Sequence, residues 1–320
     1  MSGLAAGGVL HALAAVLLWS TVASAFKLSL RELSPPQLVF ASSLVSAVFL
    51  GIVLAVRGRL PELLALPRRQ WLRSAGLGLL NPCLYYLVLL EAYHRLPAQQ
   101  AQALNYTWAL VLAYLSALLL RQRLLRTDVL AGFICYGGAL VVATRGHLLE
   151  LRFDDGLGVA LALGSTLIWA LYWVGVTRDS LDPAVRLFLN FLLGLPWAAL
   201  VCALWADFDL GWRGWAGAAY VGLFEMGLTF LLWLAALRRA GNASRVANLI
   251  FLSPFLSLVF LHHLVGERIE PATLAGLAVI VAGLLIQRKG ATRGSGWNTV
   301  ETGARSPAWS RAETYDDRGR

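Results

Sequence analysis

Long apolar stretches separated by short polar connections run along most of the chain. A helix needs about 20 residues to cross about 30 Å of hydrocarbon, and stretches near that length recur throughout. The pattern predicts ten spans: Gly8–Phe26, Pro36–Val56, Leu72–Tyr93, Ala98–Leu120, Thr127–Thr144, Gly156–Val176, Leu187–Ala206, Trp215–Leu237, Ala243–Val265 and Ala272–Gln287. The connections are too short to hold an extramembrane domain between the spans.

The apolar pattern occurs twice, because Trp71–Tyr93 aligns with Trp215–Leu237 at an offset of 144 residues. In the first stretch, small or polar residues recur on one face of a helix: Ser74, Gly78, Asn81 and Tyr85. Their counterparts in the second stretch are Ala218, Gly222, Glu225 and Thr229. Polar groups in mid-span are costly against lipid, so Asn81 and Glu225 are expected to face an interior or a wet cavity.

The repeat predicts the domain organisation. Each copy holds five spans, so the second copy enters the membrane with the opposite orientation to the first. Inverted repeats around a site near the midplane are a recurrent plan of secondary transporters. We expect an all-α integral membrane protein with ten transmembrane helices in two inverted five-helix repeats, residues 8–144 and 156–287, around a central cavity. Residues 290–320 lack apolar periodicity and are expected to form a disordered cytoplasmic tail.

Composition and charge agree with this class. Hydrophobic residues make up 58% of the chain and charged residues 14%, whereas soluble domains carry roughly 25% charge. The net charge of +9 comes from short basic blocks between apolar runs, which is typical of membrane topology and not of a nucleic-acid-binding face. With a cytoplasmic N-terminus, 20 of the 27 basic residues fall inside and 7 outside. The positive-inside rule therefore predicts a multi-pass protein of the cell (inner) membrane, in contact with the lipid bilayer, with both termini cytoplasmic.

Several kinds of chemistry have no sequence support. Cys83, Cys135 and Cys202 are isolated within apolar runs, so they predict packing and no disulfide or metal site. There is no nucleotide-binding loop, no catalytic triad spacing and no paired metal ligands. We therefore expect neither an enzyme nor a cofactor.

Glu225 is the strongest candidate for function. It follows Trp215 by ten positions, which at 1.5 Å per residue places it about halfway across the membrane. Low dielectric disfavours the charged form of a carboxyl group, so Glu225 could load and release a proton or pair with a cationic group on a substrate. The alternative is a protonated glutamate that only bonds to a neighbouring helix.

The other candidates are aromatic or amide side chains inside the spans. Asn81 precedes Pro82, which lacks an amide hydrogen and should open the helix, either to expose carbonyls to a cavity or as a packing kink; Pro254 is interpreted in the same way. Mid-span aromatic rings could stack on a substrate or hold a cation, or simply pack. Amides could bind substrate or bond between helices. The predicted substrate-binding residues are Trp19, Asn81, Tyr85, Asn105, Trp108, Trp169, Glu225 and Asn248.

Local motifs carry a family resemblance. They are Pro97-Ala98 through Asn105-Tyr106-Thr107-Trp108 in the first half, and Ser253-Pro254, Gly266-Glu267-Arg268 and Gly276 through Gly283 in the second. With the ten spans and the doubled unit, they resemble the EamA-type branch of the drug/metabolite transporter superfamily. The Asn-Tyr-Thr-Trp run is most similar to amino-acid exporter members.

The resemblance and the residues together predict a secondary transporter that moves a small organic metabolite, such as an amino acid, by alternating access. Glu225 would couple export to protons. One alternative is uptake of a quaternary amine such as choline, which suits a lone carboxylate among aromatic residues. Another is a membrane-embedded lipid-modifying enzyme, although such enzymes gather several polar residues near one interface. Whether the protein forms a homodimer is left open by the sequence.

Overall fold

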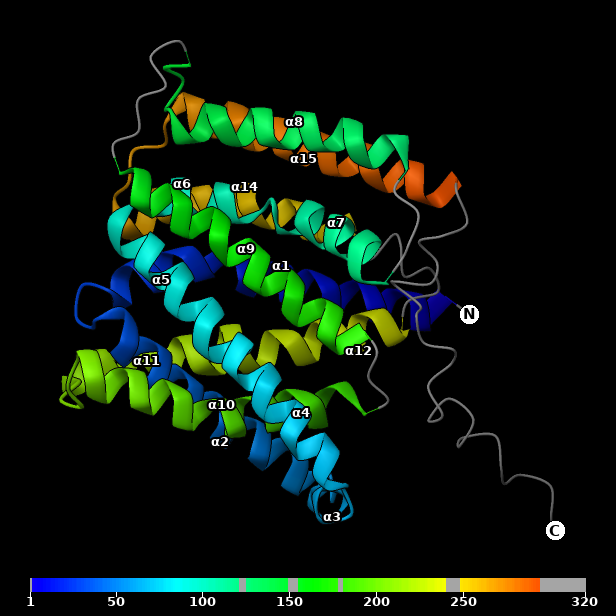
Figure 1. The fold of residues 1–320 in the computed structure, drawn as a ribbon, viewed down its shortest axis with the longest axis vertical. Coiled ribbons are helices and arrows are strands. Elements are labelled where there is room, and N and C mark those ends of the chain that lie inside the picture. The colour runs from blue at the N-terminus through cyan, green and yellow to red at the C-terminus, as the bar shows by residue number, and fades with distance from the viewer. Residues whose placement is uncertain (1, 121–124, 149–154, 178–180, 240–247, 294–320) are drawn as a thin grey trace.

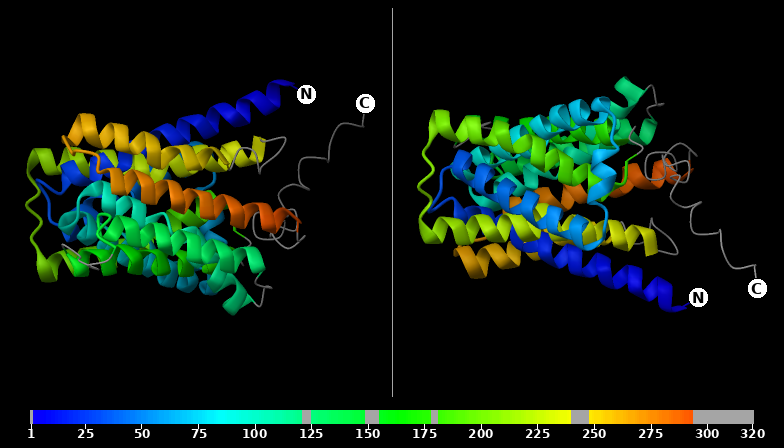
Figure 2. Two further views of the ribbon diagram at one scale, coloured as in Figure 1. Left: turned by 90° about the horizontal axis from the view of Figure 1, so that it is seen from above. Right: turned by 90° about the horizontal axis from the view of Figure 1, so that it is seen from below.

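The computed structural model describes residues 2–120, 125–148, 155–177, 181–239 and 248–293 of the chain. These residues are helical apart from short turns and contain no strand. The helices run side by side across the molecule, and the start of α1 lies at the same end of the bundle as the end of α15 (Figures 1 and 2). Residues 290–293 continue the last helix, and the rest of the expected disordered tail lies outside the described residues.

The helical segments of the described residues match an integral membrane protein. Eight of them are long and apolar enough to cross a membrane. Two further apolar helices, Leu249–Val265 and Pro271–Gln287, are shorter. Over their described residues, the ten predicted spans therefore coincide with apolar helical segments, although the number of membrane crossings stays a prediction.

The first half begins with α1 (Ser2–Ser29), α2 (Pro35–Val56) and the short α3 (Leu60–Leu64). The third predicted span is divided into three segments, which are α4 (Arg68–Gly78), the π-helical η1 (Leu79–Leu84) and α5 (Tyr85–Arg95). The break comes at Asn81, whose φ of −142° and ψ of 116° are not helical, next to Pro82. The helix opening predicted from this Asn-Pro pair is confirmed.

The fourth predicted span is also divided, into α6 (Ala98–Asn105) and α7 (Trp108–Leu120). Next come α8 (Arg126–Ala143) and α9 (Gly156–Thr177), and then α10 (Pro183–Trp205). Asp182 caps α10 by accepting from the amides of Ala184 (2.9 Å) and Val185 (3.4 Å). A side-chain acceptor at this position satisfies amides that have no partner within the helix.

The second half continues with α11 (Gly211–Tyr220), π-helical η2 (Val221–Leu228) and α12 (Thr229–Arg239). The last elements are the 3₁₀-helix η3 (Asn248–Leu252), α14 (Ser253–Phe260), π-helical η4 (Leu261–Val265) and α15 (Pro271–Arg293). Pro254 lies in the first turn of α14, where a missing amide hydrogen costs nothing. The helix changes here from 3₁₀ to α while Leu252 keeps helical dihedral angles (φ −76°, ψ −29°), so Pro254 does not open the chain as Pro82 does.

The contacts between helices show which elements lie together in the bundle. α9 packs on α5 and α7, α1 packs on α12 and α14, and α2 packs on both α10 and η2. α8 and α15 lie along each other at one edge (Figure 1). A Cβ added at Gly138 would lie 2.7 Å from the Gly276 carbonyl oxygen, so glycine permits this close approach. Gly138 therefore lies at the contact between α8 and α15, whereas nothing lies within 4 Å of a Cβ added at Gly137.

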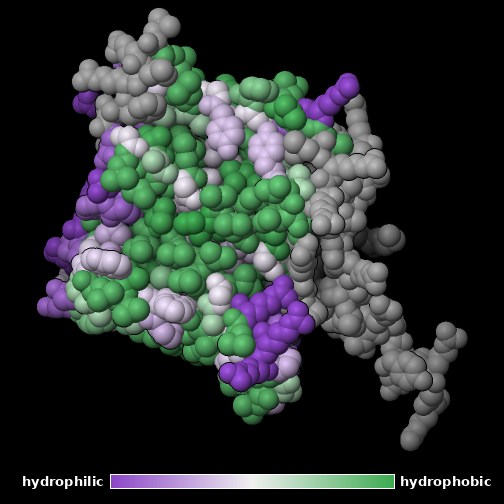
Figure 3. Space-filling view, in the orientation of Figure 1, coloured by the Kyte–Doolittle hydropathy of each residue, from purple (hydrophilic) through white to green (hydrophobic). Residues whose placement is uncertain are grey.

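Apolar side chains cover the middle of the face seen in Figure 3, and hydrophilic side chains gather towards its left edge and lower right. The exposed apolar residues are large, with Phe133 78% and Leu118 75% accessible. Such a surface is unsuited to water and matches lipid contact.

Candidate substrate-binding site

Glu225 lies in η2, in the middle of the segment formed by α11, η2 and α12. Its Oε1 accepts a hydrogen bond of 3.2 Å from the Tyr86 hydroxyl. The Trp19 side chain interacts with the same carboxyl group. Oε2 is buried and has no hydrogen-bond partner among the described residues. A buried acceptor without a partner is rare, and it leaves Glu225 able to receive a proton or a donor group from a ligand.

The π-helical geometry decides which way Glu225 faces. A π-helical turn holds an extra residue, so the side chains on either side of it do not follow α-helical spacing. Gly222 packs against α2, where an added Cβ would lie 2.8 Å from Val45 Cβ. Glu225, by contrast, meets Tyr86 of α5 and Trp19 of α1. The single face predicted from α-helical spacing is thus divided between two neighbours.

Around Glu225 the rings of several helices form a connected aromatic cluster. Tyr85 stacks on Trp169 with centroids 4.4 Å apart and planes inclined by 25°. Trp169 also meets Trp108 at 6.4 Å and Phe230 at 6.3 Å, and Phe230 meets Trp19 at 5.8 Å. We define the aromatic cluster as these rings and their ring neighbours: Trp19, Tyr85, Tyr86, Trp108, Trp169, Tyr172, Trp173, Phe230 and Trp233. The structure therefore brings Trp19, Tyr85, Trp108 and Trp169 together, as the sequence predicts.

Asn105 joins this cluster through hydrogen bonds. Its Oδ1 accepts from the Tyr85 hydroxyl at 3.4 Å, and its Nδ2 donates to Ser165 Oγ at 3.0 Å. The amide thus links α5, α6 and α9 at the edge of the ring stack. The interhelical role that the sequence leaves open for Asn105 is observed, and the half-buried side chain stays beside the cluster.

Asn81 and Asn248 are placed differently. Asn81 is buried at the break, and its Oδ1 has no hydrogen-bond partner among the described residues. The neighbouring Gly78 and Pro82 pack against Gly194 of α10, so this part of η1 faces α10. No described contact joins Asn81 to the aromatic cluster. The side chain of Asn248 lies outside the described part of the structure.

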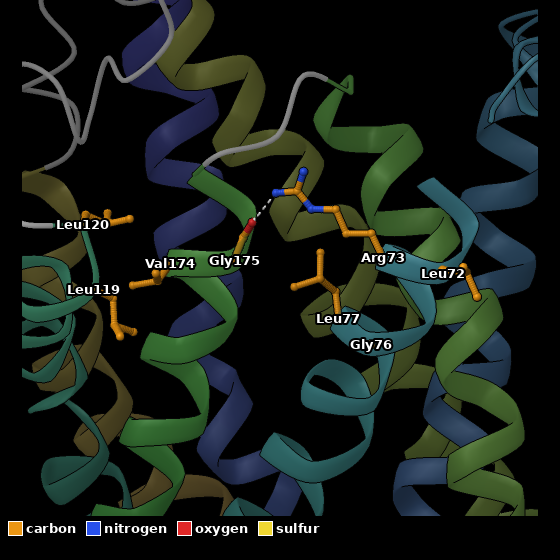
Figure 4. A pocket seen from close by; sticks show the side chains of 8 residues that line it. All are labelled: Leu72, Arg73, Gly76, Leu77, Leu119, Leu120, Val174 and Gly175. Carbon is orange, nitrogen blue, oxygen red and sulfur yellow. Dashed lines mark hydrogen bonds between the residues drawn. The ribbon is translucent and has the colours of Figure 1, made fainter. Parts of the chain in front are cut away.

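A groove opens at the end of the bundle where α1 begins. It has a volume of about 540 Å³ and is lined by parts of α4, α7 and α9. Figure 4 shows Arg73 reaching across from α4, where its guanidinium donates to the Gly175 carbonyl at 2.6 Å. Val174 and Gly175 directly follow Trp173 of the aromatic cluster. The residues that line the groove include no ring of the aromatic cluster, so the central cavity expected from the sequence stays a prediction.

The surroundings of Glu225 and Asn105 also contain residues that the predicted site lacks. Tyr86 bonds Glu225, Ser165 bonds Asn105, and Phe230 lies between Trp19 and Trp169. Tyr86 could have been found as a second mid-span tyrosine beside Tyr85. Phe230 resembles any apolar residue of its span, and Ser165 any small polar one, so neither had a distinguishing signal.

Comparison with known proteins gives one family. The model of the EamA-like transporter family matches residues 6–144 and, a second time, residues 156–287. The two matches together take in the elements from α1 to α15 that form the bundle. A solved structure, described as a crystal structure of a protein, is 23% identical with a TM-score of 0.63 and covers 90% of this chain and 98% of its own; it shares the fold.

Relatives with similar sequences include three transporters of bacteria. The uncharacterized inner membrane transporter YhbE of Escherichia coli (strain K12) is 26% identical over 79% of this chain and 79% of its own length. The uncharacterized transporter YvbV of Bacillus subtilis (strain 168) is 26% identical over 75% of this chain and 81% of its own. The aromatic amino acid exporter YddG of Ancylobacter novellus is 25% identical over 77% of this chain and 85% of its own.

Proposed function

Because this chain belongs to the EamA-like transporter family, we propose that it exports an amino acid or a related amine by alternating access, in exchange for protons. The family makes the protein a multi-pass membrane transporter of small metabolites and not an enzyme. One observation carries the finer proposal. A carboxyl group with an unpartnered oxygen, that of Glu225, lies in mid-span beside a cluster of aromatic rings.

The substrate class follows from the chemistry of the cluster. An ammonium group that pairs with a buried carboxylate favours its charged form, because each charge offsets part of the cost of burying the other. Aromatic faces attract the same cation and pack against an apolar body. We therefore propose that the amino group of the substrate bonds Glu225 and that its body lies against Trp19 and Phe230. The name of the relative YddG, an aromatic amino acid exporter, supports this class.

A second candidate is the uptake of a quaternary amine such as choline. The aromatic cluster together with Glu225 and Asn105 contains one carboxyl group and no cationic side chain. Within this set a substrate ammonium has a charged partner, whereas a substrate carboxylate has none. This composition favours an amine without a carboxylate.

Ligand-induced stabilisation separates the two substrates. A ligand at 100 times its Kd stabilises the folded form by about 2.7 kcal/mol, which raises the melting temperature of the purified protein. We expect tryptophan to do so under the export proposal and choline under the second candidate, with the effect lost in Glu225→Gln. Glu91→Gln is the matched control, because Glu91 pairs with Arg95 at 2.8 Å within α5, away from the cluster. Equal stabilisation of the wild type and Glu225→Gln would contradict a role of Glu225 in binding.

The architecture that we propose for this mechanism is ten spans in two inverted repeats, residues 8–144 and 156–287. The double match of the family model supports it. So does the 144-residue offset, which takes η1 onto η2, two π-helical segments in mid-span. Their packing is reciprocal as well, since η1 packs on α10 and η2 packs on α2.

For the orientation, we propose that both termini are cytoplasmic in the cell membrane. The distribution of basic residues, 20 inside against 7 outside, supports this orientation. The groove between α4, α7 and α9 then opens to the cytoplasm and supplies a route for substrate to the aromatic cluster. A tag at the C-terminus should be cleaved by protease in inside-out vesicles and protected in right-side-out ones; the opposite pattern would reverse the direction assigned to the groove.

Proton coupling follows if substrate and proton compete for one carboxyl group. Protonated Glu225 has no charge with which to hold an ammonium group, so binding of the substrate releases the proton. On the opposite side of the membrane a proton displaces the substrate. Both species then use the same site at different times, which is the simplest arrangement for exchange.

A further inference from the structure

The Gly266-Glu267-Arg268 motif forms a set of contacts at the end of the bundle away from the groove. Glu267 Oε1 accepts from the amide of Ala98 at 2.8 Å, and its Oε2 accepts from the amide of Gln99 at 3.2 Å. These are the first two residues of α6. Glu267 lies after η4 in the other half of the chain, 169 residues from Ala98.

The physical reason for these bonds is an uncapped helix. The first amides of a helix lack internal partners and carry partial positive charge. The residue before α6 is Pro97, whose side chain has no acceptor, so the carboxylate of Glu267 takes that role. Gln99 adds two more bonds, because its Nε2 donates to the Arg268 carbonyl at 2.7 Å and its Oε1 accepts from the Glu270 amide at 2.9 Å.

Lys27 of α1 holds the same connection from its other side. Its Nζ donates to the carbonyls of Tyr93 and Leu96, each at 2.8 Å, where α5 ends. The partial negative charge of a helix C-terminus favours a cation there. Lys27 also attracts the Glu267 carboxylate. The turn between α5 and α6 is therefore bonded to α1 and to the segment after η4.

These elements are the ones that carry the site. α1 bears Trp19, α5 bears Tyr85 and Tyr86, and α6 ends at Asn105. The bonds of Glu267, Gln99 and Lys27 join these elements at the end of the bundle away from the groove. At the other end, the groove is open between α4, α7 and α9. Alternating access requires that, in any one state, one end of the bundle is open and the other is closed. The two ends of this bundle differ in that way.

We propose that Glu267 is a positioning residue for transport. Its carboxylate acts as a latch that keeps the outer end of the bundle closed until the transporter changes to its outward-open state. The proposal rests on the alternating access of the proposed function. The latch joins the two halves by charge-assisted bonds from one side chain, so one substitution removes it. Without the latch the closed state is less stable, so the population of the outward-open state rises.

A cysteine reporter measures this population without substrate. The background replaces Cys83, Cys135 and Cys202, and the reporter is Gln102→Cys, a buried position of α6 one turn beyond Gln99. An impermeant maleimide is added from outside, and the rate of labelling is followed. Glu267→Ala should raise that rate about tenfold by shifting the equilibrium between closed and open states. Glu91→Gln is the matched control and should leave it unchanged, because its ion pair lies within one helix.

A second variant separates opening from unfolding. Ala98→Pro removes one amide donor of the latch at the first position of α6, where proline suits a helix. It should raise labelling in the same direction, with the protein still melting cooperatively. Unchanged labelling in both variants overturns the proposal, and so does loss of folding in both, which would make the contact structural. Because no substrate is present, this result is independent of whether Glu225 binds an amine or couples protons.

Discussion

Gly194 of α10 is the position where the structure makes the sharpest quantitative prediction about the broken helix. A Cβ added there would lie 2.7 Å from Pro82 Cδ and 2.8 Å from the Gly78 carbonyl oxygen. Ordinary contacts between such atoms begin near 3.5 Å, and neither atom belongs to a flexible side chain. Gly194→Ala must therefore push α10 and η1 apart.

The size of the effect comes from two opposing terms. Forcing an extra carbon into a packed contact costs about 1–3 kcal/mol. Replacing glycine by alanine inside a helix gains up to about 1 kcal/mol. The net expectation for Gly194→Ala is a loss of about 0–3 kcal/mol. Gly137→Ala provides the control, because nothing lies within 4 Å of an added Cβ at this exposed position of α8, and only the gain applies.

The assay is the apparent melting temperature of each purified variant in the same detergent. We expect Gly194→Ala to melt below the wild type and Gly137→Ala at or above it. η1 leads directly into Tyr85 and Tyr86, so Gly194→Ala should also weaken stabilisation by ligand. Melting temperatures that move in the same direction for both variants would refute the close contact between η1 and α10.

Three further predictions test the surroundings of the site. Trp169→Phe should keep the stack on Tyr85 and most of the ligand-induced stabilisation, whereas Trp169→Ala should lose both; equal retention in the two would contradict the role of the stacked rings. Arg186 is buried and donates to the Gln70 side chain at 2.5 Å, so Arg186→Met should cost about 2–3 kcal/mol, read as a lower melting temperature. The Arg59 guanidinium, bonded at 2.8 Å, holds the pKa of Glu62 below its usual range. This pair therefore stabilises the fold above the usual glutamate pKa and stops doing so as pH falls through the lowered pKa, and Glu62→Gln should flatten the acidic side of the melting curve against pH.

The helices, and one of the breaks within them, could be predicted from the sequence. Apolar length alone predicts segments such as Gly156–Val176, which lies within α9 almost end to end. The break at Asn81 follows from Pro82, whose missing amide hydrogen leaves a carbonyl of the preceding turn without its helical partner. Pro254 has the same chemistry and a different outcome, since a proline at the start of a helix leaves no bond unmade. Whether a proline breaks or begins a helix depends on where the segment before it ends, which a hydropathy pattern does not contain.

The site was predicted less completely. Mid-span depth identified Glu225 and the rings of Trp19 and Trp169, because polar and aromatic residues at that depth need a partner. The π-helical turn of η2 rotates Glu225 away from the direction that α-helical spacing implies, and no residue pattern signalled it. Phe230 enters the site through contacts between distant helices, and a single sequence carries no record of such contacts.

Transport in proteoliposomes under an imposed pH gradient tests the central claim, that Glu225 exchanges a proton for the amine it binds. With the substrate that stabilises the purified protein, the wild type should accumulate substrate according to the size and direction of the gradient. Glu225→Gln should lose that dependence, by transporting nothing or by equilibrating substrate whatever the gradient. Gradient-driven accumulation by Glu225→Gln, equal to that of the wild type, would contradict the assignment of coupling to this carboxyl group.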